Sequence, residues 1–292
     1  MTTPESFKIQ HIPRLLVNTG KSWYKGDPFK HSAIVAYYGI LSLPALIIII
    51  LKVVGSVWGE DLVQGELLGE ISSAIGPDAA DAIGVMMNNR SSANTSVMAT
   101  IIGIGTLLYG STGVFFQVQS ALDNIWGNHP RYENSLLATI VSRAKSFGFI
   151  LVIGFLLLVS LVLTSLLSTF SRQLNALLPE DMFDLLFLVD LLVSVGFIYI
   201  LFATMFKYLP SARIPWKSVR VGAALTTVMF MIGKYLLALY FNTMEPGSTY
   251  GAAGSIILIM LWVSYSSLIL LFGAHFTKQY ADKYLINPES VE

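Results

Sequence analysis

Six long apolar runs constrain this chain more than any other feature. They cover residues 33–54, 97–118, 147–168, 185–206, 219–241 and 252–276 of the 292-residue sequence. A helix needs about 20 apolar residues to cross a bilayer, and in lipid only helices and closed barrels satisfy their own backbone hydrogen bonds. The runs are continuous and do not alternate with polar residues, so they indicate helices. The sequence predicts an all-α polytopic membrane protein with six transmembrane helices.

The composition agrees with a lipid-facing surface and excludes several classes of protein. Hydrophobic residues make up 54% of the chain and charged residues 12%, whereas soluble domains carry about 25% charged residues. The first run is too long for the apolar part of a cleavable signal peptide, so we expect it to remain as a span. The net charge of zero gives no sign of nucleic-acid binding. The lack of cysteine excludes disulfides and thiolate metal sites.

The basic residues predict the orientation, because loops rich in Lys and Arg stay in the cytoplasm. One side of the predicted topology holds 14 of the 18 basic residues, and it includes both termini. We therefore expect a cytoplasmic segment at 1–30, a membrane domain at 31–280 and a cytoplasmic tail at 281–292. The 14 residues are Lys8, Arg14, Lys21, Lys25, Lys30, Arg131, Arg143, Lys145, Lys207, Arg213, Lys217, Arg220, Lys278 and Lys283.

Two segments outside the spans have helical character. Residues 7–23 mix apolar and basic positions, which fits a helix on the inner membrane surface, although Pro13 is expected to break it. An ordinary charged tail is the alternative. The long outer loop, 55–96, has leucines at near-helical spacing on both sides of a Gly76-Pro77 break. We expect short helices there that form an outer cap, either for packing alone or with a function.

Asp190 and Lys234 are the most costly residues of the sequence, because each lies inside an apolar run. A charge at the bilayer centre costs at least about 2.5 kcal/mol on insertion scales. Both positions lie at similar depths below the outer ends of their spans, so they are candidates for a pair that borders a pathway or hinge. A purely structural pair is the alternative, as is a Lys234 side chain that reaches outward alone.

Uncharged polar residues mark a second candidate site within the membrane. The second span is rich in glycine, serine, threonine and glutamine, which either allows close helix packing or lines a polar cavity. The sixth span adds hydroxyl groups at its centre and a histidine at its end. The candidate cavity residues are Gln117, Gln119, Ser264, Ser267 and His275.

Catalysis has little support in the sequence. The four histidines form no metal-hydrolase pattern. Acid–base chemistry in the inner loop would fall to Asp123, His129, Arg131 and Glu133, but loops with such residues are usually only solvated. We therefore expect no enzymatic activity, no cofactor and no metal site.

Several short motifs give the chain a family resemblance over about residues 20–282. It resembles the YihY / virulence factor BrkB family of bacterial inner-membrane proteins. The motifs are Ala36-Tyr37-Tyr38, Leu41-Ser42-Leu43-Pro44, Ala121-Leu122-Asp123-Asn124-Ile125-Trp126, Tyr208-Leu209-Pro210, Tyr250-Gly251, Leu261-Trp262 and Leu271-Phe272-Gly273-Ala274.

The resemblance implies a six-helix protein of the inner (plasma) membrane without a settled activity. Family members often have an acid after the Gly-Ala of the sixth span, where this chain has His275. Some members have carried a ribonuclease label, which this sequence does not support. A transporter or flippase-like protein for a lipid or other envelope component is the first hypothesis, and a non-transporting scaffold is the second. The sequence does not indicate the substrate, the coupling ion or the oligomeric state.

Overall fold

The structure, a computed structural model, describes residues 9–75, 77–88, 109–110, 112–127, 141, 143–144, 146–150, 183–244, 246 and 254–285. This described part is helical and contains no strand, which confirms the all-α class. Its elements are η1 (Ile9–His11), α1 (Ile12–Lys25), α2 (Pro28–Trp58), α3 (Glu60–Ile75), α4 (Pro77–Asn88), α6 (Gly113–Trp126), α8 (Phe183–Tyr208), α9 (Trp216–Met244) and α10 (Gly254–Tyr284).

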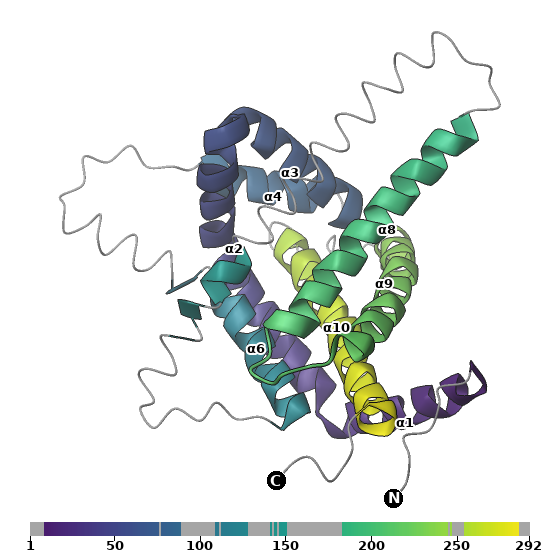
Figure 1. The fold of residues 1–292 in the computed structure, drawn as a ribbon. Coiled ribbons are helices and arrows are strands. Elements are labelled where there is room, and N and C mark those ends of the chain that lie inside the picture. Colours follow the sequence, from purple (N-terminus) through teal and green to yellow (C-terminus); the bar gives the residue numbers. More distant parts are fainter. Residues whose placement is uncertain are drawn as a thin grey trace, which may run out of the picture.

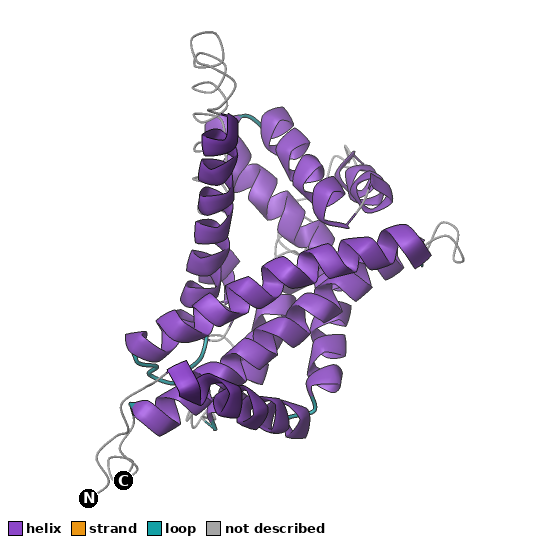
Figure 2. Cartoon of the chain, turned by 90° about the vertical axis from the view of Figure 1, so that its right-hand side faces the viewer, coloured by secondary structure: helices purple, strands orange, loops and turns teal. Residues whose placement is uncertain are grey.

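Helix α10 is the central element of the bundle. It packs against α1, α2, α3, α4, α6 and α9. Figure 1 shows α3 and α4 at one end of the bundle, and α1 with the last turns of α10 at the other. In the view turned by 90°, α1 again lies across that end (Figure 2).

Three helices of the described part are long and apolar enough to cross a membrane. They are α8 over Leu191–Tyr208, α9 over Trp216–Met244 and α10 over Gly254–Tyr284, and they coincide with the last three predicted spans. Helix α2 covers the first predicted span without interruption. Most of the second and third predicted spans lie outside the described residues, so the six-span topology stays a prediction.

The segment predicted as a cap forms two helices that pack on the bundle. Helix α3 ends at Ile75 and α4 begins at Pro77, as the predicted break requires, since proline is tolerated in a first turn but not in a helix interior. Val63 of α3 and Ile83 of α4 are buried with Leu51, Phe241 and Leu258 of the long helices. The buried apolar contacts account for the position of the cap.

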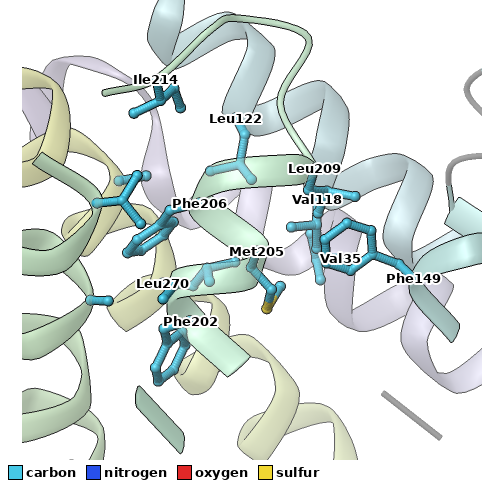
Figure 3. Close-up of a cluster of buried hydrophobic side chains, with 14 residues drawn as sticks. Val35, Val118, Leu122, Phe149, Phe202, Met205, Phe206, Leu209, Ile214 and Leu270 are labelled. Carbon is cyan, nitrogen blue, oxygen red and sulfur yellow. The ribbon is translucent and has the colours of Figure 1, made fainter. Parts of the chain in front are cut away.

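The largest buried cluster lies around the end of α8. Phe206 and Leu209 are almost fully buried there, and Leu122 of α6 packs beside them (Figure 3). The turn after α8 also contributes Ile214, so this connection is part of the core. It therefore ties α8 and α9 to α6.

Two glycine–threonine pairs set the close approach of α9 and α10. A Cβ atom on Gly222 would collide with the hydroxyl of Thr277, and one on Gly273 would collide with the hydroxyl of Thr226. Each threonine is buried, and its hydroxyl donates to the carbonyl of the glycine four residues earlier, at 2.7 Å in both helices. The polar atoms are therefore satisfied inside each helix while the backbones touch, as in other small-residue crossings in membranes.

The second predicted span, 97–118, does not coincide with one helix. Helix α6 begins inside it at Gly113 and continues to Trp126, well beyond the predicted end. The sequence Gly110-Ser111-Thr112-Gly113 has low helix propensity, and the Thr112 hydroxyl bonds the Tyr109 carbonyl at 3.2 Å. Such local side-chain bonds compete with helical ones, which explains the new start.

Arg143 was predicted in the loop before the third span, but the backbone is already helical at Val141, Arg143 and Ala144. Its guanidinium donates to the Tyr109 carbonyl at 2.8 Å and to the Thr112 hydroxyl at 3.0 Å. It also lies 4.0 Å from the centre of the Tyr109 ring, a cation–π distance. These groups near the start of α6 provide partners for the charge, and the position of Arg143 between the second and third spans stays a prediction.

Candidate functional site

A pocket opens where the turn between α1 and α2 meets α6 and α10. Its volume is about 310 Å³, at the lower end of the range for small-ligand sites. Its lining contains charged and polar residues as well as apolar ones. The lining residues are Lys25, Gly26, Asp27, Pro28, His31, Ala121, Asn124, Ile125, Leu271 and His275.

The turn that forms one wall is short and sharply bent. The Gly26 N–H closes α1 by donating to the carbonyls of Ser22 and Trp23, at 3.1 and 3.0 Å. Asp27 follows with left-handed backbone angles, φ 48° and ψ 53°. Pro28 then begins α2, in a position where the missing N–H of proline costs nothing. Two residues thus suffice to redirect the chain.

His275 of α10 also lines the pocket and contacts this turn. Its Nδ1 lies 3.2 Å from the Ser22 hydroxyl oxygen. A Cβ atom on Gly26 would lie 3.0 Å from Nε2 of the same ring, so a glycine is needed for this close approach. Leu271, one turn earlier on α10, supplies an apolar part of the wall.

Lys25 and Asp27 are exposed and carry opposite charges on either side of Gly26. Within the part of the chain that the structure describes, their side chains and that of Asn124 form no hydrogen bond or ion pair. Asp27 occupies the N-cap position of α2, where an aspartate usually accepts a hydrogen bond from the helix, yet its side chain makes no cap. These groups are therefore available to a ligand.

Packing on α10 holds α1 beside the pocket. Leu15 is buried with Phe276, Tyr280 and Tyr284 of α10, and the Tyr284 hydroxyl oxygen lies 3.1 Å from Nδ1 of His11. Pro13 lies in the first turn of α1, which begins at Ile12 after the 3-10 helix η1, so the α-helix covers only the part of the predicted segment from Ile12 onward, as the expected break requires. The outer face of α1 exposes Arg14, Val17, Asn18, Lys21 and Tyr24. Its position on a membrane surface stays a prediction.

Of the five residues predicted to line a polar cavity, the pocket contains only His275. Gln117 is half-buried and Gln119 buried on α6, and neither lines the pocket. The Ser264 hydroxyl donates to that of Ser32 at 3.4 Å, and the Ser267 hydroxyl donates to the Val263 carbonyl at 2.7 Å. These two serines connect helices or satisfy their own helix, away from the pocket wall.

The predicted pair of Asp190 and Lys234 is separate from the pocket. The two residues belong to α8 and α9, which pack against each other. Lys234 is half-buried and does not line the pocket. The Asp190 side chain lies outside what the structure describes, so the pairing stays a prediction.

A buried carboxylate anchors α6 next to the pocket residue Asn124. Asp123 precedes Asn124 on α6 and accepts hydrogen bonds from the backbone N–H of Ser211 at 2.6 Å and from its hydroxyl at 3.0 Å. These bonds hold the α8–α9 connection against α6. Sequence reasoning placed Asp123 in a solvated loop, whereas it is a buried anchor.

Lys25, Asp27, His31 and Asn124 were missed as site residues. The dipeptide Asp27-Pro28 after a glycine is a turn signal that could have marked the pocket wall. Their convergence depends on α6 and α10 reaching the same turn, which no local pattern reveals. No group of three metal-ligating side chains occurs in the described segments.

A family model named virulence factor BrkB matches residues 21–290. The chain belongs to the virulence factor BrkB family. The resemblance drawn from the motifs is thereby confirmed, and with it the assignment to a family of membrane proteins. No solved structure matches this family member significantly.

Curated relatives carry names of the same kind. The chain is 29% identical over 243 residues to a UPF0761 membrane protein of Alteromonas mediterranea, a match that covers 83% of this chain and 79% of the relative. It is 28% identical over 200 residues to one of Idiomarina loihiensis (67% and 66%) and 26% identical over 188 residues to one of Yersinia pestis (63% and 60%). The matches to the latter two span less than two thirds of those proteins, 66% and 60%.

Proposed function

We propose that this BrkB-family chain is a transporter or flippase-like protein for a lipid or another component of the bacterial envelope. The observation that carries the proposal is the pocket at the α1–α2 turn, which joins charged side chains to an apolar wall at one end of a bundle of apolar helices. Such a wall suits a molecule with a polar group and an apolar body. The pocket has the size of a headgroup rather than of a whole lipid.

We also propose that the pocket faces the cytoplasm, with the chain in the inner membrane and both termini inside. Lys21, Lys25, Lys30, Lys278 and Lys283 belong to the helix ends that surround the pocket, and an excess of basic residues is typical of the cytoplasmic side. A reporter fused after Glu292 should then read as cytoplasmic. An external reading would contradict the orientation alone.

Lipid translocation by the purified chain tests the function. The full chain is reconstituted into vesicles with a fluorescent lipid, and a membrane-impermeant quencher reports how fast the label changes leaflet, with and without an imposed proton gradient. Asn124→Phe should fill the pocket from an exposed position, whereas Ser120→Phe places the same side chain one turn earlier on α6, outside the pocket.

The wild type and Ser120→Phe should move the label faster than protein-free vesicles, and Asn124→Phe should not. Equal rates for all three proteins, or no rate above that of empty vesicles, would contradict the proposal. The scaffold hypothesis draws on an exposed apolar face of α9, made by Val228, Ile232, Tyr235, Leu236 and Leu239. Because α9 is a candidate span, lipid tails account for this face.

A further inference from the structure

We propose that the pocket recognises a zwitterionic group composed of a phosphate and a primary amine, as in an ethanolamine phospholipid. The inference rests on the proposed function, because it names the headgroup that the pocket would accept. It concerns the lining of the pocket and no other part of the chain.

The charges of the turn suit a ligand with both signs. Lys25 offers an ammonium that can bind a phosphate oxygen, and Asp27, two residues later, offers a carboxylate that can accept from an ammonium. Neither is engaged with another described group. A purely anionic headgroup would meet repulsion from Asp27, and a purely cationic one would meet repulsion from Lys25.

The backbone of Asp27 determines the shape of the turn. It is the only residue other than glycine with a positive φ in the described part of the chain. Aspartate and asparagine tolerate a left-handed backbone better than most other residues, so the turn can carry a carboxylate at this position. The side chain does not cap α2, which leaves its oxygens available to a ligand.

The rest of the lining fits the remainder of such a headgroup. Asn124 and the imidazoles of His31 and His275 can donate hydrogen bonds to phosphate oxygens. Ile125 and Leu271 provide an apolar wall for the part of the lipid next to the phosphate. The lining thus offers several donors for the phosphate of the ligand and one carboxylate, that of Asp27, for its amine.

Competitive lipid binding tests this assignment. The purified full chain is incubated in detergent with equal amounts of phosphatidylethanolamine and phosphatidylglycerol, and bound lipid is measured by native mass spectrometry. The wild type should retain the ethanolamine lipid in preference by roughly tenfold, the size expected for one charge-assisted contact.

Two variants separate the two charges without disturbing the turn. Asp27→Asn keeps the size of the side chain and tolerates the left-handed backbone, and it should abolish the preference while phosphatidylglycerol still binds. Lys25→Gln should weaken the binding of both lipids. Lys21→Gln removes an exposed charge one turn earlier on α1, outside the pocket, and should change neither.

A preference that survives Asp27→Asn would overturn the assignment, as would equal binding of both lipids by the wild type. Equal losses in Lys21→Gln and Lys25→Gln would also overturn it, because they would indicate general surface attraction.

The same chemistry occurs in free phosphoethanolamine, which is added as a competitor. Displacement of bound lipid by this soluble compound identifies a site for the headgroup alone, and resistance to it identifies the whole lipid as ligand. Both results keep the phosphate–amine assignment.

The fate of the proposed function is measured separately by translocation. Headgroup selection without lipid movement would refute the transporter proposal and leave this site standing. Lipid movement by a chain that shows no headgroup selection would refute the headgroup assignment and leave the transporter proposal standing.

Discussion

Two opposite faces of the same turns of α10 differ in their surroundings, because one packs tightly against α9 and the other borders the pocket. Gly273 and Thr277 lie against α9 so closely that no added Cβ fits, whereas Leu271 and His275 border an open pocket. The two pairs are offset by two residues, roughly half a helical turn. Small residues and internally satisfied hydroxyls form the closed face, and charges from a neighbouring turn complete the open one. The comparison shows that one helix both holds the bundle together and presents a binding wall.

The largest expected effect comes from filling the closed face. Gly273→Ala forces a Cβ against the Thr226 hydroxyl and the Phe206 ring, and overpacking of this kind costs about 1–3 kcal/mol. Thermal unfolding in detergent should show a clear loss of stability. Gly196→Ala on α8 meets no atom within 4 Å and should be neutral or stabilising by up to about 1 kcal/mol. The same sign in both variants would refute the close-packing account.

The next effect tests the anchor behind the pocket. Asp123→Ala leaves the partly buried Ser211 N–H without its acceptor, at a cost of about 1–3 kcal/mol. Ser211→Ala removes only the hydroxyl bond and should cost about 1 kcal/mol. Unfolding midpoints of the two variants compare these losses. If Ser211→Ala proved the more harmful of the two, the backbone bond would not be the main anchor.

Asn124→Ala tests the pocket side of the comparison, because Asn124 is exposed and lines the pocket. Its stability should stay within about 0.5 kcal/mol of the wild type, as for other surface substitutions. Binding of phosphatidylethanolamine should fall in the mass-spectrometric assay. A large loss of stability would mean that this face is structural too.

The smallest effect is expected at the salt bridge of Lys278 with Asp282, in which Nζ and Oδ2 lie 3.8 Å apart. Both side chains are partly exposed, and such pairs contribute at most about 1 kcal/mol. Asp282→Asn should leave the unfolding temperature almost unchanged. A shift as large as that of Gly273→Ala would show that surface charge, and not packing, dominates this end of the bundle.

The sequence predicted those parts of the fold that depend on continuous apolar stretches. The last three spans and the two cap helices are helical where expected, because apolar length and the Gly76-Pro77 break are local signals. The start of α6 was missed, because it depends on the local bond between the Thr112 hydroxyl and the Tyr109 carbonyl, which the apolar pattern does not reveal.

The pocket was predicted only through His275. Its other polar residues come from α6 and from the turn between α1 and α2 with its flanking residues, and they converge because α10 packs against all three helices. The spans alone indicated polar residues within lipid, such as Ser267, but its hydroxyl is satisfied by its own helix. Proximity between distant segments is set by packing, which no single-sequence pattern contains.

The most direct test of the central claim is a cryo-electron microscopy map of the chain in nanodiscs that contain phosphatidylethanolamine, with an antibody fragment added for size. We predict headgroup density in the pocket, with the phosphate beside Lys25 and the amine beside Asp27. A map in which the pocket holds no lipid density, and in which Asp27 turns to cap α2, would contradict the account.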